Sequence, residues 1–230
     1  MKRWKNLEDK LMMEKIAIIG AGGLGREILS LINQINEKKG QYTFIGFFDD
    51  GIQKGTFIHG YPILGGIQEL NKWEEDLSIA FGIGNAQLKE NIYKKVTNTK
   101  IKYPTLIHPS VIIQDPNSVK ILKGTIICAG TIITCDVVLE NFVLINLGCT
   151  IGHDAKIKSF CSFMPSVNIS GETRIGECVY IGTGAQIINQ IDIEDYVTVG
   201  AGSVVIENLP KGVTAVGVPA KVIKYKEEQI

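Results

Sequence analysis

The chain has 230 residues, 45% of them hydrophobic and 21% charged, and its 24 basic residues balance 24 acidic ones to a formal net charge of zero. This balance excludes the strongly basic surface typical of nucleic-acid-binding proteins, so we expect no nucleic-acid partner. The sequence has neither an apolar run of about 18 residues, as a membrane span needs, nor a signal-peptide pattern near its start. We therefore expect a cytoplasmic protein without membrane insertion.

Residues 1–13 form a charged, mixed segment, which we treat as an N-terminal extension without a functional role. The sequence then predicts a strand over Lys15–Ile19, a glycine turn over Gly20–Gly25, and a helix whose apolar residues run from Leu24 to Ile35. A glycine turn between a strand and a helix lets backbone N–H groups approach a phosphate at the helix N-terminus. This segment therefore indicates phosphate binding.

A second strand is predicted over Phe44–Phe48, and it ends at Asp49 and Asp50. These carboxylates can accept hydrogen bonds from a ribose or a base, or they can serve as turn residues before Gly51. A third strand, Ser78–Ile83, ends at Gly84 and Asn85. A helix from Ala86 to about Val96 and a short strand over Thr105–Ile107 complete a small α/β unit of parallel type.

The glycine turn alone is also typical of dehydrogenases, and glycines can serve simply to make a tight turn. A dehydrogenase is disfavoured because the acidic pair lies nearly thirty residues beyond the glycines instead of about twenty, and the unit is half the size of a dinucleotide fold. We favour a nucleotide diphosphate as the ligand.

Between residues 119 and 206 the sequence repeats every six residues. Fifteen apolar residues share one phase of this repeat: Ile121, Ile127, Ile133, Leu139, Ile145, Ile151, Ile157, Phe163, Ile169, Ile175, Ile181, Ile187, Ile193, Val199 and Val205. A small or β-branched residue usually lies two positions before each. The period predicts coils of three short strands, about eighteen residues per turn, stacked into five coils. The period does not give the handedness of the coil, and the usual rule for parallel crossovers favours a right-handed one.

The five cysteines include no C-x-x-C pair, and Cys149 and Cys161 occupy the small inward position of the repeat. We expect reduced packing residues, and we expect no metal site.

His153 follows the inward Ile151 and Gly152, so its ring should project from a corner of the coil. It is either an exposed corner residue or a base. Free imidazole titrates near pH 6.5, which suits proton removal during acyl transfer.

Several motifs together carry a resemblance to a known family. They are the glycine turn, Asp49-Asp50, Gly82-Ile-Gly84-Asn85, His108-Pro109-Ser110, Asn146 followed by His153-Asp154, and Gly217-Val-Pro219-Ala-Lys221. The chain resembles the left-handed β-helix (hexapeptide-repeat) sugar acyltransferases, the group of sialic acid O-acetyltransferases and of bacillosamine-pathway UDP-amino-sugar N-acetyltransferases. The resemblance implies a Rossmann-like α/β half domain over 14–106 that binds a nucleotide sugar. It also implies a left-handed parallel β-helix with a C-terminal cap over 107–230, and a homotrimer with active sites between subunits.

The resemblance also implies roles for residues at matching positions. His153 would be the base, Asp154 would orient its ring, and the Gly171 N–H would meet the oxyanion. The implied sugar-nucleotide residues are Gly22, Gly23, Leu24, Asp49, Asp50, Gly84, Asn85 and Asn146. The implied acetyl-CoA residues are Ser162, Gly182, Thr183, Gly200, Ala201 and Lys221. Leu24 and Ser162 depart from the family, in which several members carry histidine at these two positions.

We therefore expect an acetyl-CoA-dependent N-acetyltransferase that acts on a nucleotide-linked amino sugar in bacterial surface glycan synthesis, such as a UDP- or dTDP-4-amino-4,6-dideoxy sugar. One alternative is O-acetylation of sialic acid or another sugar. An alternative of another class is a non-catalytic β-helix that binds or scaffolds a partner.

Overall fold

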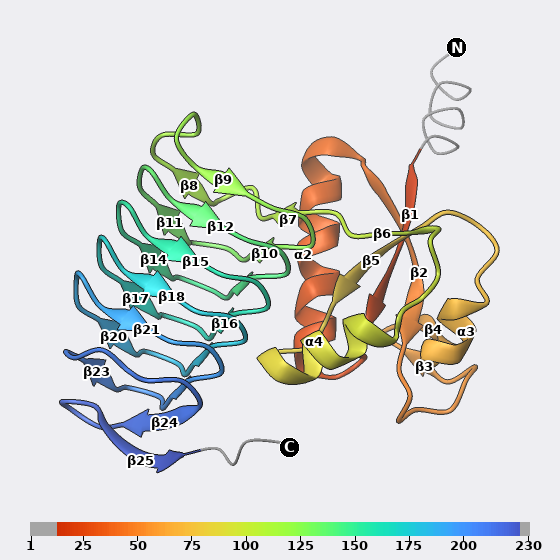
Figure 1. Cartoon of the computed structure of the whole chain (residues 1–230). Helices are drawn as coiled ribbons and strands as arrows, with labels where there is room; N and C mark the ends of the chain where they lie inside the picture. The colour runs from red at the N-terminus through yellow and green to blue at the C-terminus, as the bar shows by residue number, and fades with distance from the viewer. Residues whose placement is uncertain (1–12, 226–230) are drawn as a thin grey trace. The chain divides into compact units, whose positions relative to one another are not determined.

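The computed structural model describes residues 13–225 (Figure 1). The expected extension over 1–13 therefore lies almost entirely outside the described residues. The chain divides into two compact units. We call residues 13–83 and 94–104 the α/β unit, and residues 84–93 and 105–225 the β-helix unit. In the described part of the chain, no helix combines the length and the apolar character that crossing a bilayer requires.

The α/β unit is built on one six-stranded sheet with the strand order β3-β4-β2-β1-β5-β6. The strands are β1 (Glu14–Ile19), β2 (Tyr42–Phe48), β3 (Phe57–Ile58), β4 (Tyr61–Gly65), β5 (Leu77–Phe81) and β6 (Ile101–Lys102). All neighbouring strands pair in parallel except β3 and β4. The central strand β1 buries Ile16 to Ile19, as its continuous apolar run predicts for a parallel sheet.

Two helices belong to this unit: α2 (Gly23–Lys39) and α3 (Ile67–Asn71). The predicted helical spacing is confirmed, because α2 buries Ile28, Leu31, Ile32 and Ile35. The turn before α2 requires glycine. A Cβ atom on Gly25 would lie 2.0 Å from the Gly20 carbonyl oxygen, so the helix and the strand end approach each other backbone to backbone.

The predicted strand over Thr105–Ile107 does not belong to this sheet. It forms β7 (Leu106–Ile107), which pairs with a strand of the repeat. The Leu106 N–H donates to the Thr125 carbonyl, and the His108 N–H donates to the Ile127 carbonyl. The β-helix therefore begins earlier than the regular period indicates.

The β-helix unit consists of three parallel sheets of two-residue strands that end in a longer C-terminal hairpin (Figure 1). The β7 sheet contains β7, β10 (Ile126–Ile127), β13 (Leu144–Ile145), β16 (Ser162–Phe163), β19 (Tyr180–Ile181), β22 (Thr198–Val199), β24 (Val213–Val216) and β25 (Lys221–Tyr225). The β8 sheet contains β8 (Ile112–Ile113), β11 (Ile132–Ile133), β14 (Thr150–Ile151), β17 (Asn168–Ile169), β20 (Gln186–Ile187) and β23 (Val204–Val205). The β9 sheet contains β9 (Lys120–Ile121), β12 (Val138–Leu139), β15 (Lys156–Ile157), β18 (Arg174–Ile175) and β21 (Asp192–Ile193).

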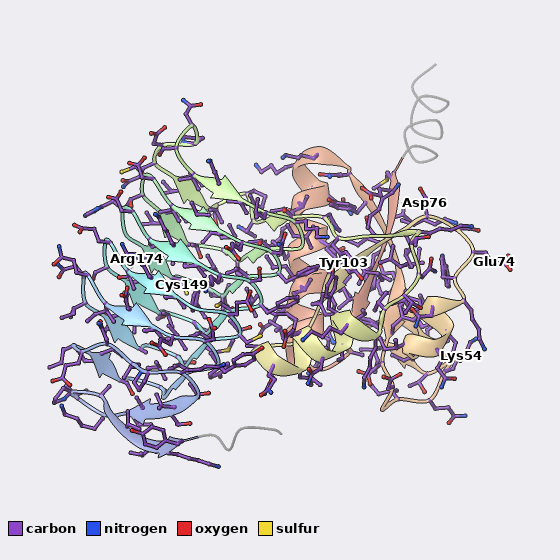
Figure 2. All side chains as sticks on the ribbon, viewed as in Figure 1. Lys54, Glu74, Asp76, Tyr103, Cys149 and Arg174 are labelled. Carbon is purple, nitrogen blue, oxygen red and sulfur yellow. The ribbon has the colours of Figure 1, made fainter. Side chains whose placement is uncertain are left out.

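Adjacent coils are offset by eighteen residues, so Ile151 pairs with Ile133 of the preceding coil and with Ile169 of the following coil. The predicted inward residues from Ile127 onward are buried, and so are Cys149 and Cys161 between them (Figure 2 labels Cys149). Coils begin at β7, β10, β13, β16, β19 and β22, which makes six coils where the period predicted five. The six-residue period did not reveal the first coil, because Ile121 lies eight positions after Ile113 where the period requires six.

We number the corners of the triangular coil by the sheets they join. The first corner joins the β7 and β8 sheets, the second joins the β8 and β9 sheets, and the third leads from the β9 sheet back to the β7 sheet. Every sixth residue from Gly124 to Gly202 lies at a corner and has a positive φ, between 54° and 74°. Nine of these fourteen residues are not glycine, although the left-handed conformation costs other residues about 1–2 kcal/mol each.

Helix α4 (Ala86–Lys95) starts in the β-helix unit, because residues 84–93 group with the coils. Its Tyr93 ring lies 4.5 Å from the Phe142 ring and 5.5 Å from the Phe160 ring, centroid to centroid. Phe142 and Phe160 are stacked residues of the third corner. The domain prediction assigned all of 14–106 to the α/β unit, whereas the structure groups residues 84–93, which include all of α4 but its last two residues, with the coils.

The backbone geometry predicts that two glycine-to-alanine changes differ in their effect on the free energy of unfolding. Gly184 has a φ of 70° and open space around it, so Gly184→Ala adds only backbone strain and should lower the free energy of unfolding by about 1–2 kcal/mol. Gly23 also has open space, but it lies in the first turn of α2 without a positive φ, so Gly23→Ala should not destabilise the protein. Urea unfolding of both variants checks this; equal losses of stability would contradict the strain argument.

Candidate active site

His153 lies at the second corner, in the tight turn between β14 and β15. Gly152 lets this turn approach the next coil, because a Cβ atom there would lie 2.5 Å from the Gly171 nitrogen. The His153 side chain is 56% exposed, and its Nδ1 lies 2.9 Å from Asp154 Oδ2. When Nδ1–H donates to this carboxylate, Nε2 carries the lone pair of the neutral ring. The geometry thus fits an accessible base whose tautomer is set by Asp154.

Gly171 occupies the same corner one coil further on, directly beneath the imidazole. A Cβ atom on Gly171 would lie 2.5 Å from His153 Nε2, so only glycine leaves room for the ring in this position. The Glu172 N–H donates to the His153 carbonyl at 2.8 Å and fixes the two coils against each other. Among the described residues, no acceptor receives the Gly171 N–H. Sequence reasoning thus placed His153, Asp154 and Gly171 together, and the structure agrees.

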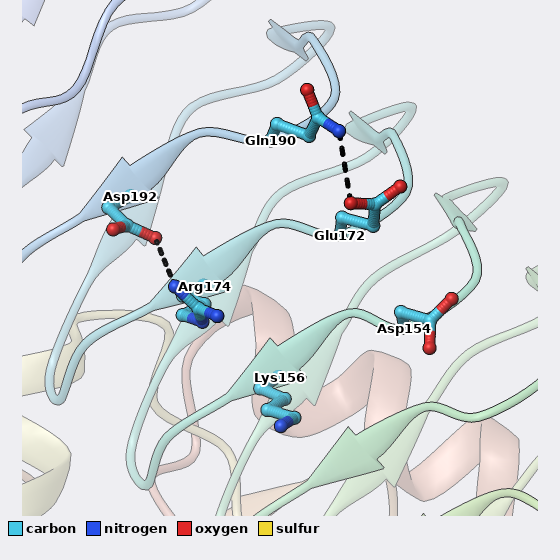
Figure 3. Close-up of a pocket in the computed structure, with 6 residues that line it drawn as sticks. All are labelled: Asp154, Lys156, Glu172, Arg174, Gln190 and Asp192. Carbon is cyan, nitrogen blue, oxygen red and sulfur yellow. Dashed lines mark hydrogen bonds and ion pairs between the residues drawn. The ribbon is translucent and has the colours of Figure 1, made fainter.

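An open groove of about 420 Å³ lies beside Asp154 on this corner and on the adjoining β9 sheet (Figure 3). Its lining residues are Asp154, Lys156, Glu172, Arg174, Gln190 and Asp192. Gln190 Nε2 donates to Glu172 Oε2 at 3.0 Å, and Arg174 pairs with Asp192 at 3.8 Å. Except for Asp154, sequence reasoning missed these residues. The signal was present, because they recur at the eighteen-residue offset from Asp154 and Lys156.

The predicted acetyl-CoA residues gather at a different corner. Gly182, Thr183, Gly200 and Ala201 follow β19 and β22, so they lie at the first corner. A Cβ atom on Gly182 would lie 2.5 Å from the Ala201 nitrogen, which shows how closely these coils stack. Lys221 begins β25 and is exposed, with its Nζ 3.6 Å from Glu207 Oε2. Within one chain, this group and His153 are therefore separated by the β8 sheet.

Asn146 also lies at the first corner, after β13. It is 5% exposed, and its Oδ1 accepts a hydrogen bond from the Leu147 N–H at 2.8 Å. One chain therefore does not place Asn146 at the corner that carries His153. Ser162 is fully buried on β16, and its hydroxyl receives a hydrogen bond from Lys89 Nζ. In this structure the Ser162 side chain has no open path to a cofactor.

In the α/β unit, the predicted phosphate-binding turn lies at the exposed start of α2. Gly22 and Gly23 have open space around them, and Leu24 is half-buried. Asp49 Oδ2 accepts the Ala21 N–H at 2.9 Å, and its Oδ1 accepts the Gly51 N–H. Asp49 therefore joins the glycine turn to the loop after β2.

Asp50 and Asn85 both receive backbone N–H groups at the start of helices. Asp50 Oδ1 accepts the Ile67 N–H at 2.9 Å, and Asn85 Oδ1 accepts the Leu88 N–H at 2.8 Å. Asn85, with Gly84 before it, precedes the first turn of α4. It lines a cavity of about 230 Å³ together with Ala86, Gln87, Cys178, Tyr180 and Thr198. Tyr180 and Thr198 were not predicted, but both are the outward residues of their strands.

None of the five cysteines, all of which lie among the described residues, forms a disulfide. Burial raises the pKa of Cys149 to about 11 and that of Cys161 to about 12, so both are neutral packing residues.

Comparisons with known proteins agree with this geometry. Residues 15–96 match the family described as PglD N-terminal domain. A GDP-perosamine N-acetyltransferase from Escherichia coli O157:H7 is 25% identical over 225 residues, which cover 95% of this chain and 100% of the relative.

Two solved structures cover nearly the whole chain. One is the acetyltransferase domain of PglB from Neisseria gonorrhoeae FA1090 in complex with acetyl coenzyme A. It is 33% identical, has a TM-score of 0.82, and the match covers 92% of this chain and 100% of that domain. The other is a perosamine N-acetyltransferase from Caulobacter crescentus with one histidine replaced by asparagine, in complex with CoA and GDP-perosamine. It is 27% identical, has a TM-score of 0.82, and the match covers 91% of this chain and 97% of that one.

These matches confirm the predicted fold class, including the left-handed winding that the period alone did not give. The chain belongs to the left-handed β-helix sugar acyltransferases, in the group of the bacillosamine-pathway N-acetyltransferases, and it is an acyltransferase.

Proposed function

We propose that this protein transfers the acetyl group of acetyl-CoA to the amine of a nucleotide-linked amino sugar in bacterial surface glycan synthesis, in the cytoplasm. The observation that carries this proposal is the imidazole of His153, held by Asp154 and seated over Gly171. The relatives support the choice of an amine acceptor, because both the Escherichia coli and the Caulobacter crescentus proteins are N-acetyltransferases of a perosamine nucleotide.

The geometry suits a direct transfer without an acyl-enzyme. The amine nitrogen attacks the thioester carbonyl, and neutral His153 accepts a proton from that nitrogen through Nε2. The C–N bond forms, the C–S bond breaks, and the thiolate of CoA leaves and is protonated. Asp154 stabilises the imidazolium that forms in this step, because it already accepts from Nδ1. Catalysis then rests on positioning and proton removal.

The Gly171 N–H is proposed to meet the oxyanion of the tetrahedral intermediate. It lies beneath His153 and has no acceptor among the described residues. A backbone N–H aimed at the developing charge stabilises it without reorganisation.

The ligand assignments remain proposals. Acetyl-CoA is assigned to Gly182, Thr183, Gly200, Ala201 and Lys221. The nucleotide sugar is assigned to Gly22, Gly23, Leu24, Asp49, Asp50, Gly84, Asn85 and Asn146. Some side-chain oxygens of Asp49, Asp50 and Asn85 already accept hydrogen bonds from backbone N–H groups. Only the remaining polar atoms of these three residues can contact the nucleotide sugar.

Replacing His153 by asparagine should lower turnover by at least about a hundredfold while sparing the binding of CoA and of the acceptor. Steady-state kinetics and calorimetric titration measure the two effects, with His59→Asn as the control because His59 is exposed and distant in sequence. An unchanged rate would remove His153 from the mechanism.

The acceptor is tested with a panel of UDP-, dTDP- and GDP-linked 4-amino-4,6-dideoxy sugars beside sialic acid, with release of CoA as the readout. We expect turnover with at least one amino sugar and no turnover with sialic acid. Turnover with hydroxyl acceptors alone would show that the enzyme is an O-acetyltransferase.

We also propose a homotrimer with the active site between subunits. The proposed acetyl-CoA residues and His153 lie at the two corners that flank the β8 sheet, so a neighbouring copy is needed to bring them together. The outward residues of this sheet are uncharged, and Thr150, Asn168 and Gln186 form a hydrogen-bonded row along it. The β9 sheet, in contrast, presents Lys156, Arg174 and Asp192.

Light scattering should therefore give a mass three times the 25.2 kDa of one chain. Asn168→Arg places a charge on the β8 sheet and should yield inactive monomers. Arg174→Gln, one strand further along the same coil but on the β9 sheet, should leave the trimer intact. A fully active monomeric wild type would refute the shared site.

A further inference from the structure

Lys89 is buried in the β-helix unit, although lysine is almost never fully buried without a counter-charge. It lies on α4 and is 2% exposed. Its Nζ donates to the Cys161 carbonyl at 3.1 Å and to Ser162 Oγ at 3.0 Å. The mechanism above does not use this amine, so its burial requires another explanation.

The surroundings of the amine fit its neutral form. A neutral amine has two N–H groups, and Lys89 finds two acceptors among the described residues. An ammonium group has three N–H groups and a full charge, which is costly to bury without a counter-charge. The titratable groups facing Lys89 from the coils are the thiols of Cys161 and Cys178. Burial raises the pKa of both thiols, so neither supplies a negative charge near neutral pH.

The neighbouring residue on the helix, Glu90, is 7% exposed and contacts the Cys178 thiol. The electrostatic influences on Lys89 come from the two cysteines. Burial lowers the pKa of Lys89 from 10.5 to about 7. In the docked helix the amine is therefore neutral above about pH 7, whereas in an undocked helix exposed to water it stays protonated up to about pH 10.5.

We propose that Lys89 is a positioning residue whose loss of a proton docks residues 86–93 of α4 onto the β7 sheet. Asn85 caps this helix and lines the cavity with Tyr180 and Thr198, so docking sets the position of Gly84 and Asn85. The consequence for the acceptor rests on the proposed function, which assigns both residues to the nucleotide sugar. The docking itself does not depend on that assignment.

The sign of the pH effect follows from proton linkage. Between about pH 7 and pH 10.5 only the undocked form binds the proton, so docking weakens as the pH falls through this range. Below about pH 7 both forms are protonated, and the balance no longer changes. The Tyr93 ring, which packs at a tilt against the Phe142 ring, holds the other end of this segment in place. The effect is therefore confined to the first turns of α4.

Hydrogen exchange of the amides of residues 88–93, in the full chain without substrates, tests the proposal. After correction for intrinsic exchange rates, wild-type protection should be roughly twentyfold stronger at pH 9 than at pH 7.5. Lys89→Met has no proton to lose and should show equal protection at both pH values. Lys89→Arg keeps its charge and should show weak protection at both.

Lys95→Met is the matched control, because Lys95 is exposed on the same helix. It should retain the twentyfold wild-type change. The wild-type pH series needs no variant, so a flat series overturns the proposal even if the substitutions do not fold. Lys89→Met exchange that follows the wild-type pH dependence also overturns it. The KM for the acceptor should fall as the protection of residues 88–93 rises with pH. If no amino sugar accepts an acetyl group while the exchange pattern is as expected, the proposed function is refuted and the docking proposal is not.

Discussion

The β-helix depends on one backbone constraint, the left-handed conformation of every sixth residue from Gly124 to Gly202. Each of these corner residues from Phe142 onward donates its N–H to the carbonyl nineteen positions earlier, at 2.8–3.2 Å. The bond from Glu172 to His153 is one of this series. The corner hydrogen bonds and the buried aliphatic residues between them offset the strain at the nine corners that lack glycine. The corner that carries His153 is therefore an ordinary corner of the repeat, distinguished only by its side chains.

The arrangement of the site follows from this regularity. Because coils stack without rotation, residues eighteen apart lie above one another, and Gly171 falls beneath His153. The same stacking places Gly182 beside Ala201 and aligns the row Thr150, Asn168 and Gln186. A repeat therefore builds a site from columns of side chains that stack on successive coils. The side chains need no flexible loop to bring them together.

The sequence alone was sufficient for most of this fold, because a six-residue period of buried aliphatics has few structural solutions. The handedness of the β-helix could not be predicted from the period, because the same spacing is compatible with a left-handed and a right-handed coil. The first coil was missed because the insertion after Ile113 hides the phase. The grouping of α4 with the coils was missed because its buried face carries Lys89 and Glu90, and charged residues at helical spacing are typical of a solvated face.

Within the candidate site, the corner phase indicated that the His153 ring projects from the coil, and the resemblance added Asp154 and Gly171. The structure brings these three residues together, and their catalytic roles stay predictions. Ser162 shows the limit of that reasoning. The resemblance implied that Ser162 contacts acetyl-CoA, but α4 covers this residue, and a packing contact between distant segments leaves no trace in a local pattern. Tyr180 and Thr198 were overlooked for the same reason, since the cavity they line exists only once the helix has docked.

The equal offset between coils also governs how such a protein tolerates changes in length. An insertion of eighteen residues shifts all downstream residues by one coil, and each side chain stays on its original sheet or corner. Six added residues instead turn the downstream chain by a third of a revolution, which would move the proposed acetyl-CoA residues from one corner of the coil to another. Divergence in this architecture can therefore proceed by insertion of whole coils, with the coils before the insertion, including the one that carries His153, kept in register.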